Sequence, residues 1–286
     1  MKHRSDFRFL DPLRVRWAEV DMQKIVFNGH YLMYFDTAVG GYWRALALPY
    51  HDTMERLQGD LYVRKATLEY AGSARYDERL EVGIRCARIG TSSLLFEAAV
   101  FRGEQRLVHG ELVYVFADPA TQTSRPVPPA LREVLEGFEA GQPMFELRAG
   151  DWDTLGADAR GIRHTVFFEE QGIAADLICD DADASALHVL AYNRFGVPVA
   201  SGRLLRAAPG VAQVGRMAAL ATVRGAGLGR AVLDALLRAA RERGDREVML
   251  KAQTAAAAFY QRDGFAAAGE VFVEAGVPHI EMRRAV

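Results

Sequence analysis

The first half of the chain combines one helical hydrophobic pattern with several strand-like ones. Residues 29–48, GHYLMYFDTAVGGYWRALAL, carry apolar side chains at intervals of three and four, which predicts a helix with one apolar face. These apolar positions are Leu32, Phe35, Val39, Tyr42 and Leu46. Gly40 and Gly41 weaken a helix at its middle, and we expect close packing against a sheet to explain them.

Four runs after this helix alternate and are rich in β-branched residues, as in an antiparallel sheet with one covered face. They are residues 61–70, 78–90, 92–103 and 107–118. Four of the ten prolines then fall between Pro119 and Pro129, and a short helix is predicted over residues 129–139. We place the domain seam at 140–145, which gives domains over residues 1–142 and 143–286.

The order of helix and strand patterns in the second half predicts an α/β domain with a mixed sheet. A helix-like segment at 158–172 precedes strand patterns at 185–193, 198–206 and 211–220. A glycine-rich loop and a long helix follow, and the apolar stripe of that helix is Leu228, Val232, Leu236 and Ala240. A strand at 246–252, a helix at 254–265 and a strand at 278–284 complete the half. The whole chain is therefore expected to be α+β, with two domains of different architecture.

Composition narrows the function classes. The 286 residues suit two ordinary domains, and half of them are hydrophobic. The net charge of -2 gives no basic field for nucleic acid. Two distant cysteines make a disulfide scaffold or a metal cluster unexpected, and the start of the chain has no apolar core of a signal peptide. No apolar run reaches the ~18 residues of a membrane span. These features predict a cytoplasmic protein with no metal, nucleic-acid or membrane partner.

The loop Arg224-Gly225-Ala226-Gly227-Leu228-Gly229 opens the long helix of the second half. Its spacing is not the G-x-G-x-x-G dinucleotide fingerprint, but unpaired N–H groups at a helix start still favour an anion. A glycine-rich turn lets those groups surround a diphosphate, and Arg224 adds a fixed charge. A tight strand-to-helix turn with a surface arginine explains the same six residues equally well.

The surrounding segment, VGRMAALATVRGAGLGRAVLDALLRAARERG, resembles motif A of the GCN5-related N-acetyltransferases (GNAT). In that family an R-x-x-G-x-G loop holds the diphosphate of acetyl-CoA. Here Arg224, Gly227 and Gly229 fill that pattern, with Gly225 in addition, and Ala226 is also implied to contact the cofactor as part of the loop. The resemblance also implies that the preceding strand pairs with the pantetheine arm through the backbone near Met217 and Ala219.

A tyrosine on the following helix often protonates the departing CoA thiolate in this family, and Tyr260 stands there. A phenol beside a thiol of pKa ~8.5 is a plausible donor, while packing of the Phe259–Tyr260 pair is the competing explanation. The segments IRHTVFFEEQGI and GVPHIEM narrow the resemblance, over residues 145–284, to the ElaA-like branch.

That branch implies an acceptor side near Glu169, Glu170 and Gln171, with His279 as either a proton acceptor or a structural residue. The acceptor is an amine-bearing small molecule or peptide of unknown identity.

Asp21 is the candidate catalytic residue of the first half. It lies in a loop before the predicted helix, where the N–H groups near Asn28 and Gly29 are free. Such a carboxylate can activate water or attack a thioester whose carbonyl oxygen binds a helix-start N–H. Capping of the helix or the turn by Asp21 is the structural alternative, and the residues alone favour it.

The same segment resembles the hotdog-fold acyl-CoA thioesterases of the 4-hydroxybenzoyl-CoA (YbgC-like) type, over residues 9–139. Asp21, Val26 and Tyr31 fill the D-x-x-x-x-V-x-x-x-x-Y pattern of the active loop and helix start. Asn28 stands where many members have histidine, so it would contribute its N–H group and a side-chain hydrogen bond. His30 is not expected to replace that histidine. Glu69 is a weaker candidate, as an auxiliary carboxylate, and is better explained as a solvated residue of a strand.

The hotdog resemblance implies a sheet wrapped around one long helix and sites that form between subunits. At least a homodimer, or a homotetramer, is therefore expected, with CoA held by residues of both chains. Lys65, Arg64 and Arg88 are available for this role, although exposed basic residues are usually solvated surface.

The sequence is compatible with three functions. The first is a bifunctional enzyme that hydrolyses acyl-CoA thioesters in one half and transfers an acyl group from CoA, as acetyl-CoA or another ester, to an amine in the other. The second is a thioesterase whose GNAT domain binds CoA as a non-catalytic regulator. The third is an assembly module, which the loop disfavours because an assembly surface needs no anion site.

Overall fold

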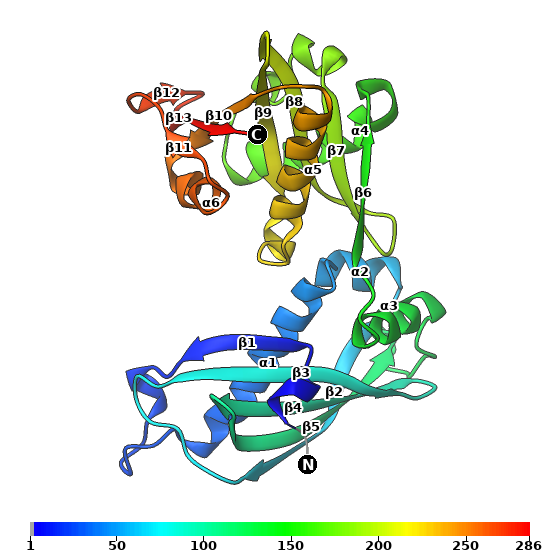
Figure 1. Cartoon of the computed structure of the whole chain (residues 1–286). Helices are drawn as coiled ribbons and strands as arrows, with labels where there is room; N and C mark the ends of the chain where they lie inside the picture. The colour runs from blue at the N-terminus through cyan, green and yellow to red at the C-terminus, as the bar shows by residue number, and fades with distance from the viewer. Residues whose placement is uncertain (1–2) are drawn as a thin grey trace. The chain divides into compact units, whose positions relative to one another are not determined.

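The computed structural model describes residues 3–286 and divides the chain by packing between Met144 and Phe145. The two units are described separately, and both are drawn in Figure 1. Among the described residues, none of the helices combines the length and apolarity that crossing a bilayer requires.

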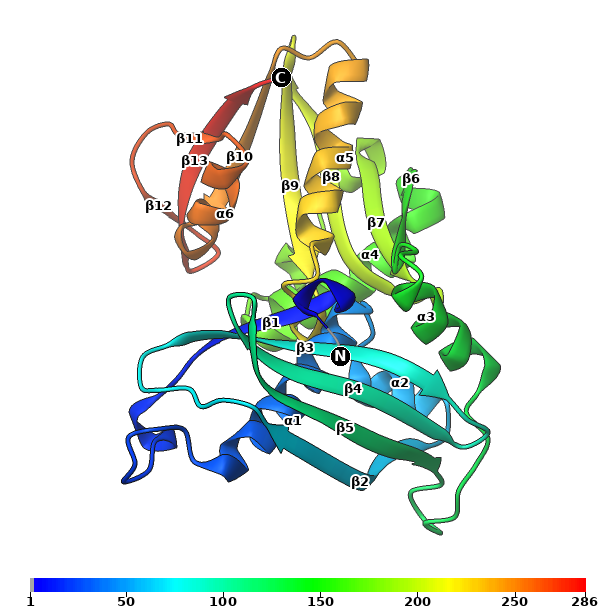
Figure 2. The same cartoon turned by 60° about the horizontal axis from the view of Figure 1, so that its bottom comes forward.

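The N-terminal unit is built on one antiparallel sheet of five strands in the order β1-β3-β4-β5-β2 (Figure 2). The strands are β1 Phe9–Arg14, β2 Asp60–Tyr70, β3 Arg79–Ile89, β4 Ser93–Arg102 and β5 Gln105–Ala117. All four pairings are antiparallel. Strand β2 is an edge of this sheet, so among the described residues of the unit no further strand pairs with its outer side.

The long helix α1, Asn28–Ala45, packs against β1, β3 and β4, which confirms a sheet wrapped around one helix. Four residues of the predicted stripe are buried, but Leu32 is 40% exposed, so the stripe is wrong at that position. A Cβ atom at Gly41 would lie 2.8 Å from the Phe9 ring, whereas Gly40 has open space. Close packing therefore explains only the second of these two glycines.

Shorter helices complete this unit. They are η1 Arg4–Asp6, η2 Trp17–Glu19, α2 Tyr50–Arg56 and α3 Pro129–Glu139. Helix α3 begins at the predicted prolines and ends before Gly141, whose φ of 87° is a left-handed angle. Its Glu139 carboxylate accepts hydrogen bonds from the Tyr42 hydroxyl and the Cys86 N–H, at 2.7 and 2.8 Å, which fastens α3 to the sheet and to α1.

The C-terminal unit is built on a mixed sheet in the order β11-β13-β10-β9-β8-β7-β6, and β12 pairs with β13. The strands are β6 Phe145–Gly150, β7 Leu187–Asn193, β8 Pro198–Ala208, β9 Val211–Ala219, β10 Glu247–Gln253, β11 Ala266–Ala267, β12 Phe272–Glu274 and β13 Val277–Ala285. The parallel pair is β9 with β10, and the other pairings are antiparallel. The predicted mixed sheet is confirmed, whereas the sequence patterns had missed β6.

The helices of this unit are α4 Trp152–Arg163, α5 Leu228–Glu242 and α6 Ala257–Arg262. Helix α5 lies along β7, β8 and β9, and its predicted stripe is buried (Figure 2). Helix α4 continues into the π-helical turn η3, His164–Glu170. The single-turn helices are η4 Ala175–Leu177, η5 Asp181–Ser185, η6 Ala221–Val223 and η7 Thr254–Ala256.

Strand β9 carries an irregularity that shapes the site. The register with β8 shifts between Ser201, opposite Ala218, and Arg203, opposite Gly215, so β9 has one extra residue there. Arg216, inside this β-bulge, has a φ of 52°. A bulge re-aims the side chain that it contains, and a positive φ at a non-glycine residue is a strained geometry typical of functional sites.

Candidate functional sites

Strands β9 and β10 separate after a short parallel pairing. Residues 211–214 of β9 pair with residues 247–250 of β10, and no pairing joins the two strands beyond Val214. The Leu220 N–H donates to the Val199 carbonyl on the β8 side, at 3.0 Å. Because neighbouring residues of a strand face opposite sides, the backbone groups of Ala219 face the gap toward β10. An extended ligand can therefore pair with the Ala219 N–H at this edge, whereas the Ala219 carbonyl accepts from Arg224 Nε at 3.0 Å.

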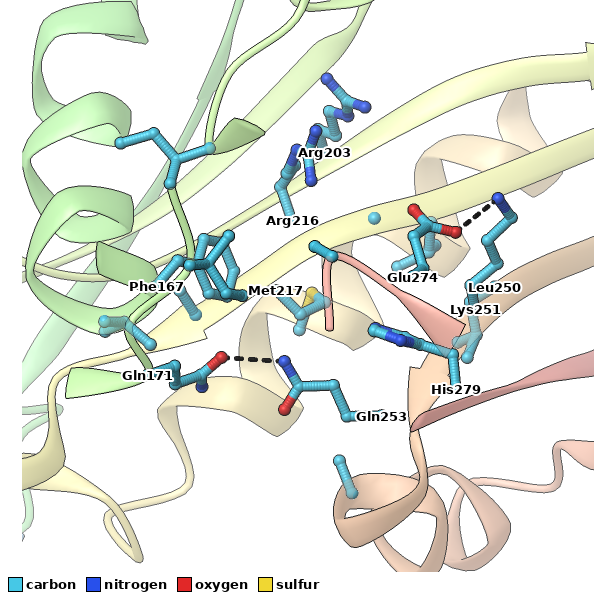
Figure 3. Close-up of a pocket in the computed structure, with 18 of the residues that line it drawn as sticks. Phe167, Gln171, Arg203, Arg216, Met217, Leu250, Lys251, Gln253, Glu274 and His279 are labelled. Atoms are coloured by element: carbon cyan, nitrogen blue, oxygen red, sulfur yellow. Dashed lines mark hydrogen bonds and ion pairs between the residues drawn. The ribbon is translucent and has the colours of Figure 1, made fainter. Parts of the chain in front are cut away.

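A cavity of about 520 Å³ lies at this separation (Figure 3). Its walls come from β9, β10, the η3 segment, α6 and the β12–β13 hairpin. The volume is in the range of small-molecule sites. Met217 and Ala219, both predicted to contact the pantetheine arm, line it together with Arg224 and Tyr260.

The glycine loop forms an open turn at the start of α5. Gly225 and Gly227 have φ of 92° and 82°, and Gly227 is the N-cap of the helix. A Cβ atom at Gly227 would meet no heavy atom within 4 Å, so the space beside this glycine is open. Ala226 was predicted to contact the cofactor, but its N–H group donates to the Val223 carbonyl at 3.3 Å and is therefore used inside the turn. The first N–H groups of α5, near Gly229, have no intrahelical acceptor.

Arg224 is paired inside the protein. Its two Nη atoms donate to the two carboxylate oxygens of Glu170, and its Nε donates to the Ala219 carbonyl at 3.0 Å. This bidentate pair lowers the pKa of the Glu170 carboxyl. The positive charge of Arg224, predicted to bind a diphosphate, is thus neutralised by Glu170, which was predicted for the acceptor side.

Tyr260 lies on α6 with its ring packed against Phe259 and Phe265, at centroid distances of 4.9 and 5.9 Å. Burial raises its pKa to about 12. Its hydroxyl has no hydrogen-bond partner within residues 3–286, although the side chain lines the cavity. The two explanations weighed for Tyr260 are therefore compatible: the ring packs in the core and the hydroxyl stays free.

His279 lies on β13 across the cavity (Figure 3). Its Nδ1 is 2.8 Å from the Val277 carbonyl, and its ring stacks on Phe272. Donation from Nδ1–H to that carbonyl leaves Nε2 as a proton acceptor. Gln253, the cross-strand neighbour of His279 on β10, donates a 2.8 Å hydrogen bond to Gln171, which lies just after the η3 segment. Glu169 is instead 3.2 Å from the His164 ring and does not line the cavity.

A buried ionic cluster beside the cavity was missed by sequence reasoning. Arg163 and Asp183 are fully buried and paired at 2.8 Å, and Arg203 bridges Asp183 and Asp180 at 2.7 and 2.6 Å. Arg216 donates to Asp180 at 2.8 Å. The available signal was the presence of arginines inside otherwise apolar strand patterns.

In the N-terminal unit, Asp21 lies at the base of a short loop closed by the Val20–Val26 bridge. Its N–H donates to the Ile25 carbonyl, and its carboxylate accepts from the Gln23 N–H at 2.8 Å. The turn-capping role that the residues favour is therefore present. It uses one carboxylate oxygen and leaves the other without a partner among the described residues.

The remaining pattern residues fix this loop to the start of α1. The Val26 N–H donates to the Ala74 carbonyl, and the Tyr31 hydroxyl accepts from the Ala74 N–H, both at 2.9 Å. Asn28, at the first position of α1, is exposed. Its carbonyl accepts from the Tyr70 hydroxyl at 3.1 Å.

Glu19 is the other residue of this region that sequence reasoning missed. It is 3% exposed, and its carboxylate accepts from the Tyr34 hydroxyl at 2.6 Å and from Arg16. Its carbonyl accepts from the Phe27 N–H at 2.9 Å, which holds the entry to α1. Burial alone would raise the pKa of Glu19, but the hydrogen bonds from Tyr34 and Arg16 outweigh it and lower that pKa.

The weaker candidates of this unit lie on the sheet surface. Glu69 on β2 is largely exposed and reaches only the His109 ring, at 3.7 Å. Lys65 and Arg64 are exposed on the same strand. Within residues 3–286, no group of three or more His, Cys, Asp or Glu side chains could hold a metal ion.

Comparisons with known proteins match each unit to a different family. The model of the acetyltransferase (GNAT) domain matches residues 166–286, and that of the thioesterase superfamily matches residues 23–109. The uncharacterized N-acetyltransferase YjcF of Bacillus subtilis is 34% identical over 128 residues, covering 44% of this chain and 90% of that protein. The acyl-CoA thioester hydrolase YbgC of Escherichia coli O6:H1 is 26% identical over 125 residues, covering 42% and 90%.

Among solved structures, an acyl-CoA N-acyltransferase from Pseudomonas aeruginosa is 31% identical, with a TM-score of 0.44 over 49% of this chain and 99% of that one. The two sequence relatives are matched over nearly their whole length by different halves of this chain. The chain therefore belongs to the GNAT acetyltransferases through its C-terminal unit, and its N-terminal unit is a hotdog-fold domain of the thioesterase superfamily.

Proposed function

We propose that the chain is a bifunctional CoA-ester enzyme. Its N-terminal unit would hydrolyse acyl-CoA thioesters, and its C-terminal unit would transfer an acetyl or other acyl group from CoA to an amine. The observation that carries the second activity is the cavity lined by the edge of β9, by Arg224 of the glycine loop and by Tyr260, whose hydroxyl is unbonded within residues 3–286.

In the transferase unit, the diphosphate of CoA binds the first N–H groups of α5 and Arg224, and the pantetheine arm pairs with β9 near Met217 and Ala219. The amine attacks the thioester carbonyl after His279 Nε2 accepts its proton. The C–S bond then breaks, Tyr260 gives its proton to the thiolate, and the second proton lost by the acylated nitrogen restores the Tyr260 hydroxyl. Because burial raises the pKa of Tyr260, its hydroxyl is protonated at neutral pH.

In the hydrolase unit, a helix-start N–H near Asn28 polarises the thioester carbonyl, and Asp21 either activates water or attacks directly. The loop geometry supports this because the Ala74 backbone and Glu19 hold both ends of the segment that joins Asp21 to α1. Removal of one oxyanion donor typically costs ~3 kcal/mol of barrier.

A second copy of the chain would complete the hydrolase site. Large apolar side chains near the Asp21 loop are exposed, with Met22 100% and Phe27 51% accessible. Strand β2 also presents an unpaired edge. Exposed apolar side chains and a free strand edge both favour association, so a homodimer or homotetramer is proposed.

Thiol detection on the full chain tests the two activities separately. Release of CoA from a panel of acyl-CoAs without amine reports the hydrolase, and the additional release that an amine mixture causes reports the transferase. We expect Asp21→Asn to abolish only the first and Tyr260→Phe to reduce only the second. Binding of CoA without any amine-dependent release would favour the regulatory role of the GNAT unit instead.

A further inference from the structure

The cavity extends past the pantetheine edge of β9 to a strongly charged end. Arg203 and Arg216 lie there in Figure 3, beyond Met217 and on the side away from the Gln171–Gln253 pair. The bulge in β9 produces this placement, because the extra residue turns the Arg216 side chain toward the cavity wall. The charged end of the cavity therefore depends on the β-bulge in β9.

The charged end carries more positive than negative groups. Three guanidinium groups, those of Arg163, Arg203 and Arg216, share the two carboxylates of Asp180 and Asp183. The hydrogen bond from Arg203 holds the pKa of Asp180 far below its usual range, so that carboxylate is already charged. One positive charge remains uncompensated inside the cluster.

The adjacent histidine does not alter this balance. Burial lowers the pKa of His188, and its ring lies between the Asp183 carbonyl and Arg163. It is therefore neutral near pH 7. The other ion pair at the cavity wall, Lys251 with Glu274 at 2.7 Å, is balanced within itself.

Arg216 is the member of the cluster that can meet a ligand. It donates only through Nη2, to Asp180, and neither its Nε nor its Nη1 has an acceptor within residues 3–286. Arg203 is nearly buried and donates through both Nη atoms to the two aspartates. The Arg216 side chain is 26% exposed and the cluster carries one excess positive charge, so this end of the cavity attracts an anionic partner.

We propose that the acyl acceptor is an amine that also carries an anionic group, a carboxylate or a phosphate, and that Arg216 binds this group. The inference rests on the proposed transferase function and adds the chemical class of its acceptor. The anion lies at the bulge of β9, and the amine of the same molecule is directed toward His279 across the cavity. Arg216 suits this role because its Nη1 group, which has no acceptor within residues 3–286, can donate charge-assisted hydrogen bonds to a carboxylate or phosphate.

Matched pairs of amines test this assignment on the full chain saturated with CoA. One arm compares free amino acids with their carboxamides, and the other compares phosphorylated amino alcohols with the unphosphorylated compounds. Binding is measured by calorimetry, and acyl transfer by amine-dependent CoA release from acetyl-CoA. The variants are Arg216→Gln, Arg216→Lys as the charge-conserving variant, and Arg206→Gln as a control at an exposed arginine of β8 outside the cavity.

We expect the anionic member of at least one pair to bind about ten- to a hundredfold more tightly, because a hydrogen bond to a charged group is lost in its neutral partner. Arg216→Gln should remove this preference, Arg216→Lys should keep part of it, and Arg206→Gln should leave it unchanged. The arm that shows the preference identifies the anion.

Equal binding of both members, no binding by any compound, or an unchanged preference in Arg216→Gln overturns the inference. A preference in binding without acyl transfer supports the anion site and contradicts the transferase function. Acyl transfer to neutral and anionic amines alike contradicts the anion site and leaves the transferase function standing.

Discussion

The guanidinium of Arg224 forms a bidentate pair with the Glu170 carboxylate, with Nη1–Oε1 at 2.5 Å and Nη2–Oε2 at 2.6 Å. Arg224 belongs to the glycine loop, and Glu170 ends the π-helical turn η3. The residue proposed to bind the diphosphate is thus occupied by an internal anion. A CoA molecule must replace this carboxylate to use the charge of Arg224.

We therefore predict that Glu170→Gln strengthens CoA binding and that Arg224→Gln weakens it. Both side chains are more than one-third exposed, so the ion pair contributes at most ~1 kcal/mol. The gain in affinity from Glu170→Gln should be no more than about fivefold. Calorimetric titration with CoA measures both changes, and Glu169→Gln is the neighbouring control. Weaker CoA binding by Glu170→Gln would contradict a competition between Glu170 and the diphosphate.

Tyr260→Phe should lower the rate of acyl transfer by about a hundredfold or more, the usual contribution of a positioned acid. CoA affinity should stay nearly unchanged because the buried ring is retained. Since burial raises the pKa of Tyr260 to about 12, this residue should cause no loss of activity between pH 7 and its own pKa. Steady-state kinetics across that range measure both effects, and equal turnover by the variant would remove Tyr260 from the mechanism.

Asp21→Asn should reduce thioester hydrolysis by about two orders of magnitude or more while the fold persists. Asparagine can still accept the hydrogen bond from the Gln23 N–H, so the turn is preserved and the ionised carboxylate is lost. Thiol release from acyl-CoA without amine measures the activity, and sedimentation measures the oligomeric state. Hydrolysis at the wild-type rate would place the chemistry on another residue.

Glu19→Gln should destabilise the N-terminal unit by about 1–3 kcal/mol at pH 7, since it weakens the buried hydrogen bonds from Tyr34 and Arg16. The folded-state pKa of Glu19 is lowered. Its contribution is therefore full above the unfolded pKa of ~4.3 and is lost as pH falls through the lower folded value.

Denaturant unfolding at pH 7 and at pH 3 tests this prediction, with the exposed Glu55→Gln as the control. The difference between wild type and Glu19→Gln should shrink at pH 3. A difference that is constant with pH would show that the charge of Glu19 does not support the fold.

Local sequence patterns predicted most of the architecture. The steps of three and four in α1 and α5 and the alternation in β2 to β5 describe contacts that each segment makes through its own periodic face. The glycine loop was also readable, because the open turn at Gly227 and the helix after it depend on adjacent residues. The D-x-x-x-x-V-x-x-x-x-Y pattern correctly located a loop held at the start of α1.

Pairings between distant residues were decided only by the tertiary structure. Arg224 and Glu170 are separated by 54 positions, and Arg163 meets Asp183 across 20, so no periodicity relates them. The bulge that contains Arg216 is a property of the pairing between β8 and β9, which neither strand shows alone. The sequence therefore determined the elements and the CoA-type motifs, because these depend on neighbours along the chain. The tertiary structure decided which charges are free to bind a ligand, because that depends on which side chains, distant along the chain, are in contact in the folded protein.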